Sequence, residues 1–395
     1  MSIVSCKRFF TNPCNPMKKS SRQSSPGRTP RKVVRYAVVG LGHIAQVAVL
    51  PGFAHARHTQ LAALVSSEPE KLKKLGKKYR VSLTYSYEQY DECLRSGAID
   101  AVYLALPNDL HRDYAVRAAN AGIHVLCEKP LAVSVREGKA MLETAEKNHV
   151  KLMTAYRLHF EPANLQSIAL VRSGRLGEPR YFSSTFSFQI ADPKNIRLQQ
   201  ARGGGAIFDI GTYCINAARY LFADEPTEVF ALAVSREDPR FKEVDETTSV
   251  ILHFPKERLA AFTVSFGAST SGRYELVGTK GSVVLDPAYE YSVALKQTVT
   301  INDQSREKTF PRTDQFGGEI EAFSEWVLGR REPEPSAAEG LADLRVIEAI
   351  HRSIRTGRTV KLDTLKQRTR PDRKQEKRKP PVREPALVEV ESPHD

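Results

Sequence analysis

The sequence predicts a doubly wound, parallel α/β domain followed by an α+β domain with mostly antiparallel strands. Three observations support this fold class: a glycine-rich turn between a β-rich run and a helix, alternating helix-like and strand-like segments after it, and short strands with alternating polarity after residue 180. The chain of 395 residues is long enough for two domains. We place the first domain at residues 33–153 and the second at residues 154–362.

Most of the excess positive charge lies on two arms. The formal net charge is +13, but residues 1–31 contain seven Lys/Arg and no acid, and residues 366–383 contain nine Lys/Arg against two acids. Both arms are poor in apolar residues, so we expect residues 1–32 and 363–395 to be disordered. Such arms bind polyanions by charge alone, and no helix-turn-helix or interleaved aromatic pattern predicts specific nucleic-acid binding.

The cysteine pattern and the apolar runs indicate the compartment. Five cysteines are scattered without a CxxC pair, which argues against a disulfide framework or a zinc site. No apolar stretch is long enough to span a membrane, and the N-terminus lacks the apolar core of a secretory signal. We therefore expect a cytoplasmic protein that binds no metal and does not associate with membranes.

A glycine-rich turn follows the first predicted strand. In YAVVGLGHIA, Gly40, Gly42 and Ala45 have the spacing G-x-G-x-x-A, and IAQVAVL begins a helix. Gly40 would permit the tight turn, Gly42 would let a pyrophosphate approach the backbone, and the helix N-terminus would stabilise its charge. We expect a dinucleotide here, with His43 and Ile44 of the turn also contacting it.

The end of the second strand bears on the choice of dinucleotide. QLAALVSS is followed by Glu68, Pro69, Glu70 and Lys71. The hydroxyl of Ser66 and the ammonium of Lys71 suit a 2′-phosphate, so we expect NADP to be preferred over NAD. Two alternatives stay open: Glu68 could hold a ribose, and Lys71 also fits the solvated face of a helix over EKLKKLGKKY.

Polar side chains follow two further predicted strands. YSYEQYDECLRSG and HRDYAVRAANAG are expected to be helices, while AIDAVYLAL and IHVLCEKP are expected to be strands. Ligands bind at the carboxyl ends of the strands of such a sheet. Leu106, Asn108 and His111 follow one strand and Glu128 and Lys129 end the other, which makes all five candidate contacts. A charged pair of this kind is as often a surface feature.

The segments AVVGLGHIA, LPNDLH, HVLCEKPLA and GGGAIFDIGTY, in this order, resemble the family of glucose-fructose oxidoreductase and inositol dehydrogenase. The likeness runs from about Val33 to Leu362 and is closest to the glucose-fructose oxidoreductase branch. It implies a Rossmann domain, then an α+β domain with a large, open sheet through which relatives form dimers or tetramers. It also implies a nicotinamide cofactor and a small carbohydrate substrate.

The second half of the sequence agrees with this expectation. YFSSTFSFQI, SVILHF and LAAFTVSF are strand-like, and YELVGTKGSVVLD is typical of a hairpin. An amphipathic helix is expected at about 336–356, ended near Gly357.

GGGAIFDIGTY places Asp209 and Tyr213 four residues apart, on one face of a helix. From the residues alone, Asp209 could be a helix cap and Tyr213 a core aromatic. The resemblance implies instead that this face looks onto the nicotinamide, across a cleft from Lys129. Arg157 and Arg202 are candidate sugar or phosphate contacts, although two surface arginines are nearly as good an interpretation.

The resemblance implies hydride transfer between a carbohydrate carbon and C4 of the nicotinamide. Tyr213 would be the general acid/base, because a neighbouring ammonium, that of Lys129, would stabilise its phenolate. Asp209 would orient the substrate and balance the lysine. Many family members carry His at the position of Tyr213, so the tyrosine indicates the glucose-fructose oxidoreductase branch.

Several alternatives stay open from sequence. Glucose-fructose oxidoreductase is exported and has a long N-terminal arm, whereas this arm is short and basic, so we expect a freely exchanging sugar dehydrogenase or reductase acting on D-xylose, D-glucose or 1,5-anhydrofructose. The alternatives are an enzyme that retains its cofactor, a glycosidase that uses NAD transiently, and a non-catalytic dinucleotide sensor. The presence of Lys129, Asp209 and Tyr213 together weighs against the sensor.

Overall fold

The computed structural model describes residues 33–363, 365 and 369–390. The expected disordered arm at 1–32 lies outside the described residues. The first sheet has six parallel strands in the order β3-β2-β1-β4-β5-β6. Its strands are β1 (Val34–Val39), β2 (Thr59–Val65), β3 (Leu83–Tyr85), β4 (Ala101–Leu104), β5 (His124–Glu128) and β6 (Leu152–Ala155).

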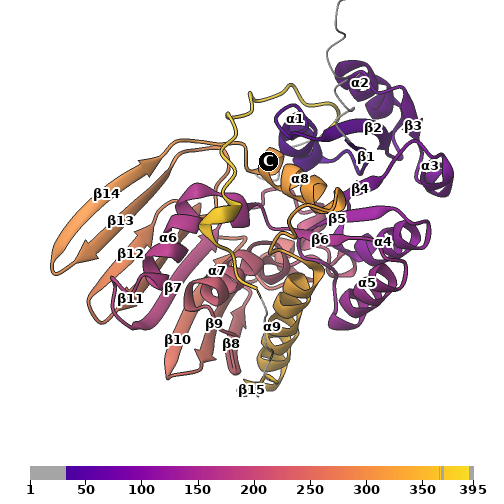
Figure 1. The fold of residues 1–395 in the computed structure, drawn as a ribbon. Helices are drawn as coiled ribbons and strands as arrows, with labels where there is room; N and C mark the ends of the chain where they lie inside the picture. The colour runs from indigo at the N-terminus through magenta and orange to yellow at the C-terminus, as the bar shows by residue number, and fades with distance from the viewer. Residues whose placement is uncertain (1–32, 364, 366–368, 391–395) are drawn as a thin grey trace, which may run out of the picture. The chain divides into compact units, whose positions relative to one another are not determined.

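Helices cover both faces of this sheet, which explains why its central strands are almost entirely apolar. One face packs against α3 (Tyr90–Arg95), α4 (His111–Asn120) and α5 (Val135–Lys147). The other packs against the π-helical turn η1 (Ala45–Val49), α1 (Leu50–Gly52), α2 (Pro69–Tyr79) and α8 (Gln315–Val327). The predicted doubly wound domain is confirmed, with one helix, α8, supplied by a distant part of the chain (Figure 1).

The second sheet has nine strands in the order β14-β13-β12-β11-β7-β10-β9-β8-β15, and only β7 and β10 pair in parallel. The expectation of a large, mostly antiparallel sheet is confirmed. Its strands are β7 (Pro179–Ser187), β8 (Glu228–Val234), β9 (Thr247–Phe254), β10 (Arg258–Ser265), β11 (Ser271–Gly278), β12 (Gly281–Leu285), β13 (Leu295–Ile301), β14 (Gln304–Phe310) and β15 (Val360–Lys361).

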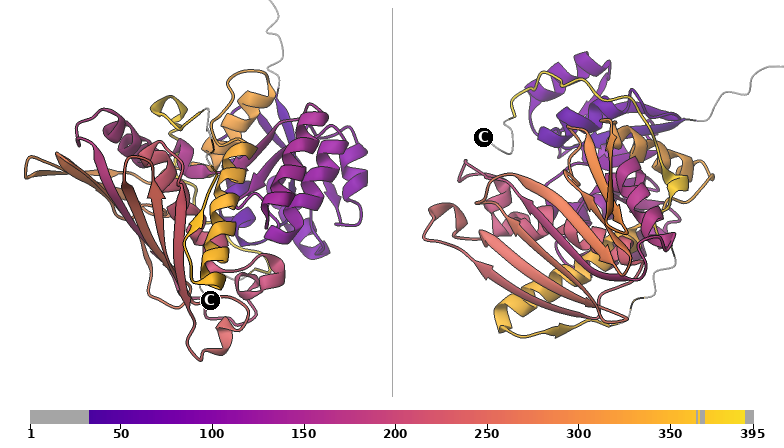
Figure 2. Two further views of the ribbon diagram at one scale, coloured as in Figure 1. Left: turned by 90° about the horizontal axis from the view of Figure 1, so that it is seen from below. Right: turned by 90° about the vertical axis from the view of Figure 1, so that its left-hand side faces the viewer.

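One face of the second sheet is covered and the other is open. Burial alternates along β9 and β10, so every second side chain faces the core. The core face packs against α6 (Pro162–Arg172), α7 (Thr212–Phe222) and α9 (Ala337–Thr356). Figure 2 shows α9 between this sheet and the helices of the first domain.

The structure differs from the expected elements in two places. Tyr85, which we placed in a helix, ends the short edge strand β3, and the helix begins only at Tyr90. Strand β6 belongs to the parallel sheet and runs to Ala155, so that sheet extends slightly beyond the expected boundary at 153.

The end of the chain also differs, because residues 369–390 lie along the folded body instead of forming a solvated tail (Figure 1). We call this segment the C-terminal strap. The Gln375 amide donates to the carbonyl of His159 at 3.2 Å, and Lys377 pairs with Glu325 on α8 at 2.8 Å. The strap was expected to be disordered because it has few apolar side chains, but polar contacts hold it.

The far end of the strap reaches the glycine turn. The buried Gln46 side chain accepts the Val388 N–H at 2.8 Å and donates to the Val388 carbonyl at 2.9 Å. The same amide donates to the carbonyl of Leu41, which belongs to the glycine turn, at 2.9 Å. Gln46 therefore joins the strap to the backbone that we expect to bind the dinucleotide.

Candidate active site

One pocket of about 530 Å³ collects nearly all the residues that the sequence motifs predict. It lies at the carboxyl ends of β1, β4 and β5, where an open α/β sheet binds ligands. The predicted residues that line it are Gly40, Gly42, His43, Ile44, Ser66, Lys71, Leu106, Asn108, Glu128, Lys129, Arg157, Arg202, Asp209 and Tyr213.

The glycine turn fits a dinucleotide. Gly40 has φ +91°, and a Cβ there would lie 2.3 Å from the carbonyl oxygen of Ala105, so only glycine is accommodated. A Cβ on Gly42 would meet no atom within 4 Å, because that position faces open space in the pocket. The backbone is thus bare where a pyrophosphate would approach, and a helical turn begins just beyond it at Ala45.

Lys71 and Glu68 form an ion pair at the next strand end. The Lys71 ammonium lies 2.6 Å from a Glu68 carboxylate oxygen, and Ser66 accepts the Glu68 N–H at 3.3 Å. Lys71 is buried, so the alternative of a solvated helix face does not describe it. A cation, a carboxylate and a hydroxyl therefore share this wall of the pocket, which can bind either a 2′-phosphate or a 2′-hydroxyl.

Lys129 and Asp209 meet across the pocket. The Lys129 ammonium contacts Oδ1 of Asp209 at 2.6 Å and its backbone carbonyl at 2.8 Å. Arg197 donates to the other carboxylate oxygen at 2.7 Å. Burial disfavours the charged carboxylate, but Lys129 and Arg197 hold the pKa of Asp209 well below its ordinary value. Asp209 is therefore ionised and fixed between two cations.

The same contacts define the state of Lys129. Burial alone would favour the neutral amine, yet Asp209 and Tyr213 raise the pKa of Lys129 above its ordinary value. The lysine is therefore an ammonium ion, and it lies 4.9 Å from the centre of the Tyr213 ring.

Tyr213 lies between cations and aromatic rings. The guanidinium of Arg157 is 5.0 Å from its ring centre, near Lys129. The rings of Phe186 and Tyr289 pack against it at centroid distances of 5.6 and 5.8 Å. The tyrosine is half-buried in the pocket wall, so it is more exposed than an ordinary core aromatic.

Arg157 is fixed in the wall of the pocket. The alternative that the sequence left open, an arginine on the surface, does not describe it. It is buried, donates to the side chain of Gln315 and to the carbonyl of Tyr289, and lies at the start of the 3₁₀ turn η3 (Arg157–Phe160). Burial disfavours its charge, but Tyr213 and Glu290 raise its pKa. It therefore adds a fixed positive charge beside Tyr213.

The glycine stretch closes the pocket from the second domain. Gly203 has φ +72°, and a Cβ there would lie 2.5 Å from Val133 and 2.8 Å from Asn108. Asn108 donates to the Gly203 carbonyl at 2.8 Å, and Arg202 pairs with Asp109 at 3.1 Å. The glycine permits close contact between the two domains, and Arg202 and Asn108 hold that contact at the pocket rim.

His111 was expected to contact the cofactor, and the structure places it elsewhere. Its ring is fully buried and hydrogen-bonds the carbonyls of Pro130 and Leu106 at 2.9 and 3.0 Å. Both ring nitrogens thus face backbone carbonyls, and the N–H of the ring donates to one of them, so His111 ties the two loops that follow β4 and β5. It positions the pocket wall and does not line the pocket.

Sequence reasoning missed several lining residues. They are Tyr87, Phe186, Phe188, Arg197, Tyr289, Glu290, Tyr291 and Phe316. One local signal was available, because two basic residues, Arg197 and Arg202, precede the glycines. We named only Arg202 as a candidate contact. The aromatic residues come from the loop after β3, from β7 and the residue just beyond it, from the loop after β12 and from the start of α8, and no local pattern connects these segments.

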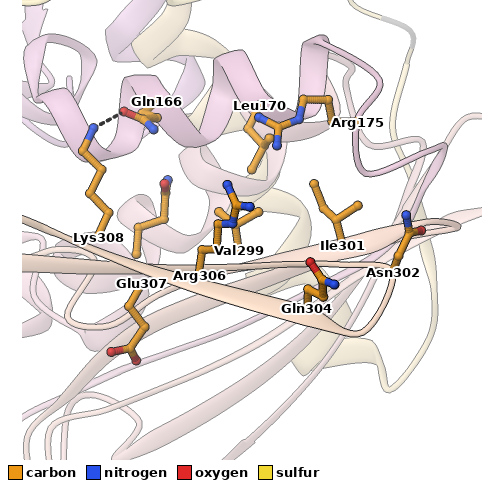
Figure 3. Close-up of a pocket in the computed structure, with 11 residues that line it drawn as sticks. Gln166, Leu170, Arg175, Val299, Ile301, Asn302, Gln304, Arg306, Glu307 and Lys308 are labelled. Atoms are coloured by element: carbon orange, nitrogen blue, oxygen red, sulfur yellow. Dashed lines mark hydrogen bonds between the residues drawn. The ribbon is translucent and has the colours of Figure 1, made fainter.

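A second cavity of about 660 Å³ lies between α6 and the β13–β14 hairpin (Figure 3). The side chains of Arg175 and Arg306 extend into it above Val299 and Ile301, whereas Glu307 points away. It contains none of the motif residues, so we assign the chemistry to the first pocket.

The described part of the chain shows no cluster of three or more His, Cys, Asp or Glu arranged to hold a metal ion. Within residues 33–363, 365 and 369–390, no helix has the length and apolar character needed to cross a membrane.

Two family models match the chain. The oxidoreductase family with an NAD-binding Rossmann fold matches residues 34–156, and the GFO/IDH/MocA C-terminal domain matches residues 165–284. An NADP-dependent D-xylose 1-dehydrogenase of Haloferax volcanii is 31% identical over 83% of this chain and 99% of its own.

Solved structures agree with these matches. The aldose-aldose oxidoreductase of Caulobacter crescentus, complexed with glycerol, is 41% identical with a TM-score of 0.80, covering 84% of this chain and all of its own. The 3-ketoreductase KijD10 of Actinomadura kijaniata, with NADP and TDP-benzene, is 26% identical with a TM-score of 0.75, covering 82% of this chain and 98% of its own. The chain therefore belongs to the GFO/IDH/MocA family of NAD(P)-dependent oxidoreductases.

Proposed function

We propose that this protein is an NADP-dependent oxidoreductase that acts on an aldose or a related small carbohydrate, with Tyr213 as its general acid/base. The observation that carries the proposal is the convergence of Lys129, Asp209 and Tyr213 in the pocket that begins at the glycine turn. Hydride transfer needs a dinucleotide site and a proton-handling group beside it, and this pocket offers both.

A bound nicotinamide would accept or supply a hydride at C4. When a sugar hydroxyl is oxidised, Tyr213 as phenolate takes the hydroxyl proton while the hydrogen on carbon leaves with its electron pair. Lys129 and Arg157, both cationic and close to the ring, stabilise the negative charge on the tyrosine oxygen. Asp209 fixes the Lys129 ammonium, and the role of orienting the substrate then falls also to Arg197 and Arg202 at the rim.

Preference for NADP over NAD is part of this proposal. Lys71 and Ser66 offer an ammonium and a hydroxyl to a 2′-phosphate, and Arg202 lies in the same pocket. Glu68 already pairs with Lys71, so the carboxylate that would otherwise hold a free ribose is engaged. Two NADP-dependent xylose dehydrogenases among the relatives and the NADP complex of KijD10 support the same choice.

The relatives also support the assignment of Lys129 and Tyr213. Structures of KijD10 have been solved with a lysine replaced and with a tyrosine replaced. Those two positions lie as far apart along the KijD10 chain as Lys129 and Tyr213 do here. We infer that they are the corresponding residues.

We further propose a homodimer or homotetramer formed through the open sheet face. Leu232, Ile251, Leu259 and Tyr181 are each 47–60% exposed on β8, β9, β10 and β7. Leu259 pairs with Tyr181, and Ile251 pairs with Ala261, which lies two residues along β10 from Leu259. Paired residues on neighbouring strands, and residues two apart on one strand, point to the same side of the sheet. A contiguous apolar patch of this kind marks an association surface.

A second function is favoured by one observation, the 41% identity to an aldose-aldose oxidoreductase. In that case the cofactor would stay bound and be reduced by one aldose and reoxidised by another. The Gln46 contact from the strap to the glycine turn would favour such retention.

The test is the absorbance of reduced nicotinamide with purified protein, NADP or NAD, and a panel of aldoses. Net reduction of NADP with one or two sugars supports the freely exchanging dehydrogenase. Conversion of an aldose pair without added nucleotide supports internal cycling. If neither occurs although NADPH binds, the sugar oxidoreductase proposal is wrong and a sensor is favoured.

A further inference from the structure

A fully buried tyrosine hydroxyl lies between two carboxyl groups behind Lys129. Tyr103, on β4, has its hydroxyl 2.8 Å from Oε1 of Glu128 and 2.9 Å from Oε1 of Glu319. Glu128 ends β5 and lines the pocket, whereas Glu319 belongs to α8 and is sealed from solvent. The three side chains thus connect the pocket wall to the interior.

The number of protons in this group is constrained by geometry. A tyrosine hydroxyl has one hydrogen and can donate one hydrogen bond, so two ionised carboxylates cannot both be satisfied by it. The second short contact needs a proton on a carboxyl group, which then donates to the tyrosine oxygen. Oε2 of Glu319 has no hydrogen-bond partner among the described residues, as expected for a neutral carboxyl.

The surrounding charges favour Glu319 as the protonated partner. Burial raises the pKa of Glu128, but Lys129 and Arg157 oppose that rise. Burial and the charge of Glu128 raise the pKa of Glu319 well above its ordinary value; Arg157 opposes this rise and Asp314 adds to it. Burial also raises the pKa of the Tyr103 hydroxyl, which therefore keeps its proton.

The position of Glu128 connects the charge of this group to Lys129. Its Oε2 accepts the backbone N–H of Lys129 at 3.3 Å, so the carboxyl is next to the residue whose ammonium pairs with Asp209. If Glu128 and Glu319 were both ionised, two negative charges would lie behind Lys129 and compete with Asp209 for its ammonium.

We propose that Tyr103 and Glu319 are positioning residues: Tyr103 keeps its own proton and the carboxyl groups of Glu128 and Glu319 share a second one, so that the group carries a single negative charge and Lys129 stays directed at Asp209 and Tyr213. The proposal rests on the function proposed above, since it assigns the group to the same pocket. It implies that turnover falls at high pH, where the shared proton is lost, in addition to any effect of Tyr213.

Three variants separate this role from packing. Tyr103→Phe keeps the ring and removes the hydroxyl, and we expect it to lower kcat by about tenfold. In Glu319→Gln an amide donates to the tyrosine oxygen as the neutral carboxyl does, so we expect kcat near wild type and loss of the high-pH decline. Tyr36→Phe is the control. Tyr36 is equally buried, and its hydroxyl hydrogen-bonds at 2.6 Å to Ser324, which lies on α8 like Glu319, so its partner is a hydroxyl and not a carboxylate.

An infrared measurement tests the proton without requiring turnover. The difference spectrum of wild type minus Glu319→Gln near neutral pH should contain the carbonyl band of a neutral carboxylic acid. Absence of that band, or an unchanged kcat and pH profile in Tyr103→Phe, overturns the proposal. If the band is present and no sugar is turned over, the proposed function fails while the shared proton stands.

Discussion

Two groups of charged side chains contact one helical segment, residues 207–222, and they differ in burial and in charge balance. The pocket cluster, Lys129, Arg197 and Asp209, lies where the π-helical turn η6 (Ile207–Gly211) leads into α7, and its side chains are 12–31% exposed. The buried cluster, Arg219 with Glu339 and Asp343, lies further along α7 against α9, and its side chains are at most 1% exposed.

The balance of charge differs between them. In the pocket cluster two cations surround one carboxylate, which leaves positive charge facing the pocket. In the buried cluster Arg219 contacts Glu339, Asp343 and Glu225, and Glu225 also pairs with Arg370 of the strap. The same kinds of group therefore line a pocket that a ligand can reach in one cluster and stabilise the interior in the other.

The largest difference should appear when Tyr213 beside the pocket cluster is changed. We expect Tyr213→Phe to lower kcat by about 100- to 10,000-fold because the proton acceptor is lost. The free energy of unfolding and the affinity for NADPH should change little, since the ring stays in place. Steady-state kinetics and urea unfolding measure both, with Tyr181→Phe on the open sheet face as the matched control. Near-normal turnover would remove Tyr213 from the mechanism.

The buried cluster should show the opposite pattern. We expect Arg219→Met to lower the free energy of unfolding by about 3–5 kcal/mol, because it removes the cation that contacts the buried Glu339 and Asp343 and one of the two cations that contact Glu225. The control is Arg180→Met, which removes an exposed pair with Glu178 and should cost under about 1 kcal/mol. Equal urea midpoints for the two variants would contradict the structural role of Arg219.

Removal of the strap tests how far the buried cluster depends on it. A chain ending at Leu365 loses Arg370, the Gln375 contact and both Val388 contacts to Gln46. We expect the free energy of unfolding to fall by about 1–3 kcal/mol, because the buried side chains of Gln46 and Glu225 lose partners. Unchanged unfolding would show that the strap is not bound in solution.

The pH dependence of stability should have opposite signs in the two clusters. Burial and Glu339 raise the pKa of Asp343 to about 6 against the effect of Arg219, so its contribution is present at low pH and is lost as the pH rises through about 6. The pKa of Asp209 is lowered, so its contribution is lost only as the solution is acidified below the range of an ordinary carboxyl. Urea unfolding from about pH 4 to about pH 7 should show a fall in the free energy of unfolding that is smaller in Asp343→Asn. An identical slope in that variant would contradict the assignment.

The two clusters also differ in how far sequence could predict them. Lys129, Asp209 and Tyr213 belong to local motifs at a strand end and on a helix face, and the structure brings them together. Arg219 and Asp343 are far apart in sequence, and no local pattern connects them. Burial decides such contacts, and it depends on how distant elements pack.

The same limit explains the other differences. Helix α8 packs on the parallel sheet although it follows β14 of the second sheet in the chain, so Glu319 could not be connected to Tyr103 from sequence. We expected the strap to be disordered because it contains few apolar residues. Hydrogen bonds and ion pairs hold it against the folded body instead. His111 was assigned to the cofactor because it follows a strand end, but its ring turns inward to the backbone.

The most direct test of the proposed chemistry is isotope transfer from an aldose deuterated at its carbon positions. The protein is incubated with NADP and the labelled sugar that gives the largest turnover, and the reduced nucleotide is examined by mass spectrometry and NMR. We expect deuterium at C4 of the nicotinamide in wild type and almost none in Tyr213→Phe over the same time. Unlabelled reduced nucleotide, or equal labelling by the variant, would contradict hydride transfer assisted by Tyr213.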